Sequence, residues 1–65
     1  MKHLVFYRTN DVFLAEERLQ AANVEVEVVP TPVQDKAYCG VCVRVTDKEI
    51  DRAITILESM EFIVV

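Results

Sequence analysis

Two runs of alternating valines constrain the fold of this chain more than any other feature of its sequence. Residues 24–28 read Val-Glu-Val-Glu-Val, and residues 41–45 read Val-Cys-Val-Arg-Val. A period of two is typical of β-strands buried on one face, because successive side chains point to opposite sides of a sheet. The valines are predicted to face a covering layer, and the open face is predicted to carry Glu25, Glu27, Cys42 and Arg44.

Two further strands are expected near the ends of the chain. Residues 3–8 are rich in aromatic and β-branched side chains, and residues 62–65 are apolar throughout. Pro30 and Pro32 should end the strand of residues 24–28, because proline has no N–H to donate to a sheet.

A first helix is predicted between the first two strands. Thr9 and Asn10 are good N-cap residues, and Asn23 suits a left-handed position at the helix end. Apolar residues that recur every three or four positions form one stripe, as expected for a helix that packs on a sheet. The stripe consists of Val12, Ala15, Leu19 and Ala22.

A second helix is predicted after the strand of residues 41–45. Thr46 and Glu49 have the spacing of a capping box, in which the two residues satisfy each other's backbone N–H groups. The buried stripe of this helix is predicted to be Ile50, Ala53, Ile54 and Leu57.

The order of elements predicts an α+β fold of the ferredoxin-like type, β-α-β-β-α-β, in a single domain over residues 1–65. Right-handed crossovers place the fourth strand at one edge, followed by the first, third and second strands. The result is a four-stranded antiparallel sheet with both helices on one face.

Charge and hydropathy exclude several classes of function. Eleven acidic residues against seven Lys and Arg give a formal net charge of -4, whereas nucleic-acid affinity comes largely from cations set against phosphates. No apolar run is longer than four residues, but a membrane-spanning helix needs about 20. We expect no nucleic-acid partner and no membrane span.

Location and assembly follow from the start and the length of the chain. Residues 1–8 read as the beginning of a strand and not as a signal peptide, so we expect a cytoplasmic protein with reduced cysteines. A chain of 65 residues buries only about 60 % of its unfolded surface, and a homodimer through the open sheet face would help to cover it.

The connection between the second and third strands is longer than a hairpin requires. About 2 to 5 residues close a hairpin, whereas this connection runs from Pro30 to Cys39. The topology places Cys39 beside Thr9 and Asn10, where the unpaired N–H groups of the first helix favour a thiolate. Gly40 would allow a close backbone approach or a positive φ angle. Cys39 is thus a candidate reactive cysteine, and an inert, half-buried loop cysteine is the alternative.

Cys39 and Cys42 have C-x-x-C spacing, but redox centres with this motif place the first cysteine at a helix start. If residues 41–45 form a strand, the two Cα atoms lie about 10 Å apart, farther than the roughly 7 Å that a disulfide spans. With His3 they also make too few ligands for a structural zinc site. We expect no disulfide, no metal and no cofactor.

Arg44 has two interpretations. If residues 27 and 42 pair, Arg44 lies almost opposite Glu25 and makes a cross-strand ion pair with it. Alternatively, its guanidinium contacts an anion near the thiol.

The Cys-Gly pair of residues 39–40 follows the Pro-x-Pro of residues 30–32, and three residues separate it from Arg44. With this pattern the chain resembles a small bacterial family of unknown function labelled Putative Se/S carrier protein-like. The resemblance implies a cysteine that holds sulfur or selenium as a persulfide or selenosulfide, and it assigns this role to Cys39, with Gly40 and Arg44 as companions. Further matching residues are Phe6, Thr9, Asp11, Ala15, Glu16 and Val29.

The first hypothesis is therefore a sulfur or selenium carrier, a carrier or binding protein rather than a catalyst, with donor and acceptor proteins as partners. The alternative is a non-catalytic regulatory or assembly module that dimerises through its open sheet face, an analogy based on fold alone. A C-x-x-C redox protein is a third interpretation. The carrier hypothesis requires a reactive thiol at Cys39, whereas the module hypothesis tolerates its loss.

Overall fold

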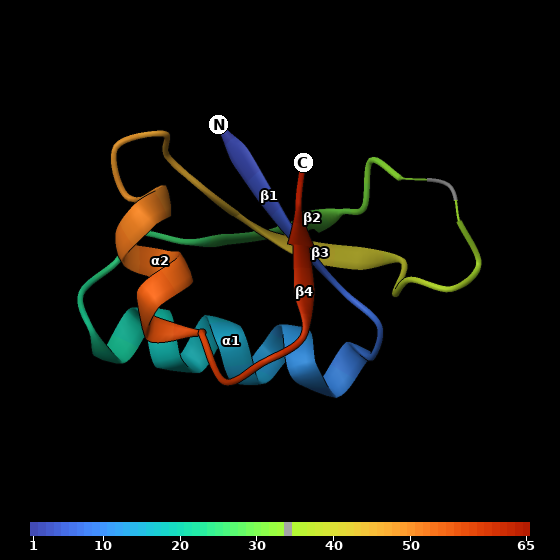
Figure 1. Ribbon diagram of the computed structural model, residues 1–65, viewed down its shortest axis with the longest axis horizontal. Coiled ribbons are helices and arrows are strands. Elements are labelled where there is room, and N and C mark those ends of the chain that lie inside the picture. The colour runs from blue at the N-terminus through green and yellow to red at the C-terminus, as the bar shows by residue number, and fades with distance from the viewer. Residues whose placement is uncertain (34) are drawn as a thin grey trace.

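The computed structural model describes residues 1–33 and 35–65 and shows six elements of secondary structure (Figure 1). They follow the predicted order β-α-β-β-α-β. The elements are β1 (Lys2–Phe6), α1 (Thr9–Ala21), β2 (Glu27–Pro30), β3 (Val41–Val45), α2 (Ile50–Ile56) and β4 (Phe62–Val64).

The four strands form one antiparallel sheet in the order β2-β3-β1-β4. This order is the predicted one, with β4 and β2 at the edges and β1 and β3 in the centre. Both helices lie on the same side of the sheet (Figure 1), and the hydrophobic core fills the space between the two layers. The ferredoxin-like α+β fold expected from the valine alternation is confirmed.

The core contains the inward side chains of the central strands and the apolar stripes of the helices. Phe6 packs against Phe62 of the edge strand with ring centroids 5.5 Å apart. The buried cluster consists of Leu4, Phe6, Val12, Ala15, Leu19, Val24, Val43, Val45, Ala53 and Leu57, with Val26, Val28 and Val41 packed against it. The valines of both alternating runs therefore face the helices, as predicted.

The second strand begins later than the valine alternation predicts. The prediction was residues 24–28, but β2 is Glu27–Pro30, and Pro30 is accepted because it lies in an edge strand. The physical reason is the end of α1, where Asn23 has a φ of 63° and the N–H of Val24 donates to the carbonyl of Leu19. This Schellman-type ending confirms the role of Asn23 and ties Val24 to the helix instead of the sheet.

The shift changes the register of the β2–β3 hairpin. Glu27 pairs with Arg44 and Val29 pairs with Cys42, so the prediction that residues 27 and 42 pair was wrong. Glu25 precedes the strand and is not the partner of Arg44.

The predicted N-terminal caps of both helices were also wrong. Thr9 and Asn10 are the first helical residues of α1, and Arg8 occupies the cap position with no side-chain cap hydrogen bond in the described chain. Glu49 occupies the cap position of α2, likewise without a side-chain cap. Its N–H bonds the backbone carbonyl of Thr46 in a turn, which replaces the capping box.

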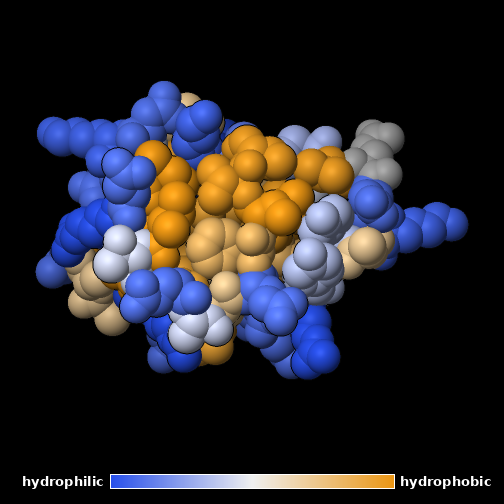
Figure 2. All heavy atoms as spheres, in the orientation of Figure 1, coloured by the Kyte–Doolittle hydropathy of each residue, from blue (hydrophilic) through white to orange (hydrophobic). Residues whose placement is uncertain are grey.

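Part of the exposed apolar surface lies on the face that carries α2 and β4. Figure 2 shows an apolar surface across the middle of the face that carries α2 and β4. Ile54, Val64 and Val65 are 36 %, 41 % and 43 % exposed, and we call these three residues the apolar patch. Ile54 was predicted to be buried with Ala53 and Leu57, but it lies at the rim of the α2 stripe. Neither helix of the described residues is long and apolar enough to cross a membrane.

Leu57 and Ile54 provide a matched test of the core. We expect Leu57→Ala to lower the free energy of unfolding by about 2–5 kcal/mol, because it leaves a cavity under the sheet, and Ile54→Ala to lower it by about 1 kcal/mol or less. Urea unfolding of both variants measures the difference. Equal losses would contradict the placement of α2 on the sheet.

Candidate functional site

The backbone of Cys39 is fixed from two directions. Its N–H donates to the carbonyl of Phe6 at 2.8 Å, which ties the segment before β3 to the last residue of β1. On the other side, the Thr31 hydroxyl donates to the Cys39 carbonyl at 2.7 Å, and the Thr31 N–H donates to the carbonyl of Gly40 at 3.0 Å. The loop between β2 and β3 therefore ends in a defined position at the sheet.

The thiol of Cys39 lies at the beginning of α1. Its Sγ is 3.1 Å from Oγ1 of Thr9, a hydrogen bond in which either atom can be the donor. The side chain is half-buried and packs against the core, on the side of the sheet that the helices cover. The predicted placement of Cys39 beside Thr9 is confirmed. Asn10 is exposed, and no hydrogen bond joins it to Cys39 in the described residues.

Gly40 does not have the role that the sequence suggested. Its φ is not positive, and a Cβ built at this position would meet no atom within 4 Å. Neither backbone freedom nor close approach therefore requires glycine in this conformation. Gly40 is exposed and contributes its carbonyl to the bond with Thr31.

Arg44 lies on the open face of the sheet. Its Nη2 is 2.9 Å from Oε2 of Glu27, directly across the β2–β3 hairpin. The cross-strand ion pair was predicted with Glu25, but Arg44 makes it with Glu27. Because Arg44 is held on the open face and Cys39 packs on the covered face, the structure does not bring the guanidinium to the thiol.

Cys42 is a buried thiol within β3. It has no exposed surface, and its Sγ lies 3.9 Å from the carbonyl of Pro30. Burial raises the pKa of Cys42, although a hydrogen bond with Thr31 and the charge of Arg44 oppose the rise. Both cysteines are free. Among residues 1–33 and 35–65, no three His, Cys, Asp or Glu side chains lie close enough to share a metal ion.

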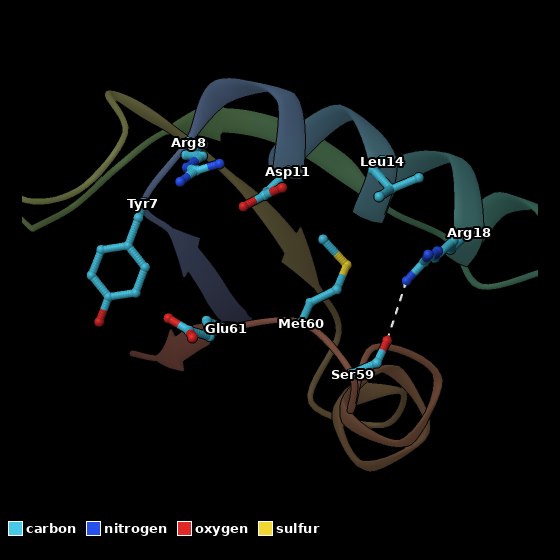
Figure 3. A pocket seen from close by; sticks show the side chains of 8 residues that line it. All are labelled: Tyr7, Arg8, Asp11, Leu14, Arg18, Ser59, Met60 and Glu61. Carbon is cyan, nitrogen blue, oxygen red and sulfur yellow. Dashed lines mark hydrogen bonds between the residues drawn. The ribbon is translucent and has the colours of Figure 1, made fainter.

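A cleft between α1 and the chain that leads into β4 was not predicted. It has a volume of about 540 Å³, and side chains from both walls point into it (Figure 3). Positions 8, 11, 14 and 18, which are the cap residue and three residues of α1, follow a helical period. This period is the sequence signal that could have revealed one wall. The lining residues are Tyr7, Arg8, Asp11, Leu14, Arg18, Ser59, Met60 and Glu61.

Two tyrosines connect this cleft to the cysteine loop. Tyr7 at the end of the cleft stacks on Tyr38 with ring centroids 5.0 Å apart and an interplanar angle of 28°. A hydrogen bond with Tyr7 is the main cause that raises the pKa of Tyr38. Since Tyr38 precedes Cys39 in the chain, the stacked pair links the cleft to the loop that carries the thiol.

The fold and the site define a small α+β protein with one accessible thiol, held at the start of a helix beside a hydroxyl. A model of the protein family described as Putative Se/S carrier protein-like matches residues 3–64. The chain belongs to this family, as the resemblance suggested. No curated protein and no solved structure matched the chain.

We expect the two thiols to react with different pH profiles. Each unit by which burial raises the pKa of Cys42 leaves about tenfold less thiolate at neutral pH. Its alkylation should therefore be slow near neutrality and increase as the pH rises through that raised pKa. Iodoacetamide labelling of Cys39→Ser reports Cys42, and labelling of Cys42→Ala reports Cys39. Faster labelling of Cys42 at neutral pH would contradict the structure.

Proposed function

We propose that the protein carries sulfur or selenium on Cys39, as a persulfide or selenosulfide. The observation that supports this role is the position of the thiol, which is half-buried at the start of α1 with the Thr9 hydroxyl 3.1 Å from its sulfur. The family description names the same class of cargo. Donor and acceptor proteins are the partners that such a carrier requires, and we expect it to work in the reducing cytoplasm.

Loading and unloading are two sulfur exchanges. The Cys39 thiolate attacks the outer sulfur of a donor persulfide, a new S–S bond forms to Cys39, the donor S–S bond breaks, and the donor leaves as a thiolate. An acceptor thiolate then attacks the outer atom on Cys39, takes it, and releases the Cys39 thiolate. A selenosulfide donor exchanges its outer selenium in the same way, so no further oxidant or reductant is needed.

Thr9 and the first turn of α1 support the anionic forms in this cycle. The Thr9 hydroxyl can donate its hydrogen bond to a thiolate or to the inner sulfur of a persulfide. The first N–H groups of a helix have no partner within the helix and carry partial positive charge. Both features favour negative charge at the place where Cys39 holds its cargo.

Mass spectrometry after treatment with inorganic polysulfide tests the carrier role. Wild-type protein should gain the mass of sulfur on the peptide that contains Cys39, Cys42→Ala should gain it equally, and Cys39→Ser should not. Thr9→Val should load about fivefold more slowly, the effect of one hydrogen bond of about 1 kcal/mol, whereas Thr55→Val is a matched control in α2. Sulfur that persists in Cys39→Ser would refute the proposal.

An assembly module that forms a homodimer is the second candidate function, and the apolar patch favours it. The open sheet face was the expected contact, but Val5 and Cys42 on that face are already buried within one chain. Ile54, Val64 and Val65 are the exposed apolar groups beside α2 and β4, and β4 is an edge strand with a free side for pairing.

Light scattering at high micromolar concentration tests the dimer. We expect the wild-type chain to associate and Val64→Glu to be monomeric, because a carboxylate in the patch would lose its hydration on pairing. Lys48→Glu serves as a control that adds negative charge elsewhere. A monomeric wild-type chain would remove the support for this second function.

A further inference from the structure

The cleft between α1 and the chain that leads into β4 is lined by four charged side chains that take part in no ion pair among the described residues. The ion pairs of residues 1–33 and 35–65 are those of the N-terminus with Asp47, Arg44 with Glu27, and Arg52 with Glu49. The charged groups of the cleft take part in none of them. They are Arg8, Asp11, Arg18 and Glu61.

These charges lie at two different parts of the cleft. Figure 3 shows Arg18 at one end, where its Nη1 donates to the Ser59 hydroxyl at 3.5 Å. Asp11 and Glu61 lie toward the other end, with Arg8 and Tyr7. One end therefore holds a cation and a hydroxyl, and the other holds two carboxylates against the single cation of Arg8. Because the carboxylates outnumber that cation, the two ends have opposite preferences for ligand charge.

The middle of the cleft is apolar. Leu14 lines the α1 wall, and the Met60 side chain points into the space between that wall and the chain leading to β4 (Figure 3). Met60 is half-buried and packs against the core. The part of a ligand that lies between the two charged ends can therefore be an aliphatic chain or a thioether.

We propose that this cleft binds a zwitterionic amino acid or short peptide, with its carboxylate at Arg18 and Ser59 and its ammonium group at Asp11 and Glu61. The volume of about 540 Å³ is that of a small-molecule site. The mixed charges disfavour a simple anion or a simple cation, since each would meet repulsion at one end. A ligand that carries both charges satisfies both ends.

The Tyr7–Tyr38 stack places this site next to the cysteine loop. The identity of the donor rests on the proposed carrier function: an amino acid or peptide that carries a persulfide is then the small-molecule donor, and it leaves as its thiolate once its outer sulfur is bonded to Cys39. Binding itself does not depend on that function, because none of the groups that hold the ligand belongs to the thiol chemistry. The two proposals can therefore fail separately.

Amide NMR titration with S-methylcysteine and S-methylglutathione tests the site, because these thioethers cannot exchange with Cys39. We expect shifts at the amides of the cleft that saturate at millimolar ligand, and the tighter of the two probes identifies an amino acid or a peptide as the ligand class. The amino-acid probe without its carboxylate or without its amino group should bind at least roughly tenfold more weakly.

Charge variants identify the contacts. Arg18→Glu should abolish the shifts and Asp11→Asn should weaken them, whereas Lys48→Glu, which makes the same charge change outside the cleft, should bind like the wild type. Cys39→Ser should also bind normally. The inference is overturned if neither probe shifts the cleft amides or if Arg18→Glu binds as well as the wild type, even when Cys39 loads sulfur.

Discussion

The hydrogen bond from the Cys39 N–H to the Phe6 carbonyl holds the site together. Phe6 ends β1, and α1 begins only a few residues later, so a bond at this point fixes the long β2–β3 loop against the start of the helix. The thiol then meets Thr9, and Tyr38 meets Tyr7. Thr31 holds the same end of the loop from the β2 side, through its bonds to the carbonyls of Cys39 and Gly40.

Most of the fold could be predicted from the sequence because two periodicities are unambiguous in it. The valine alternation marks a sheet buried on one face, and the stripe of α1 marks the helix that covers it. The errors occur where local patterns compete with tertiary contacts. Val24 continues the alternation in the sequence, but its N–H bonds the Leu19 carbonyl at the end of α1. The strand β2 therefore begins later than predicted, and the β2–β3 register and the partner of Arg44 differ from the prediction as well.

The site was predictable to the extent that topology alone places residues. The neighbourhood of Cys39 and Thr9 follows from parallel directions of β1 and β2 and needs no side-chain detail. The cleft could not be found in this way, because its second wall, including Ser59 and Glu61, depends on how the chain after α2 returns to the sheet. No sequence period connects that segment to α1.

The burial of Cys42 has a consequence for how long a carrier could keep its cargo. A second thiol within reach of a persulfide attacks its inner sulfur, forms a disulfide and expels the outer atom as sulfide. Cys42, the other thiol of this chain, is buried on the sheet face that no helix covers. Cys39 packs against the core on the face that the helices cover. If Cys39 carries a persulfide, the other thiol of the chain is therefore closed to solvent on the opposite face of the sheet, so a nucleophile from another molecule would have the freer approach to the outer atom.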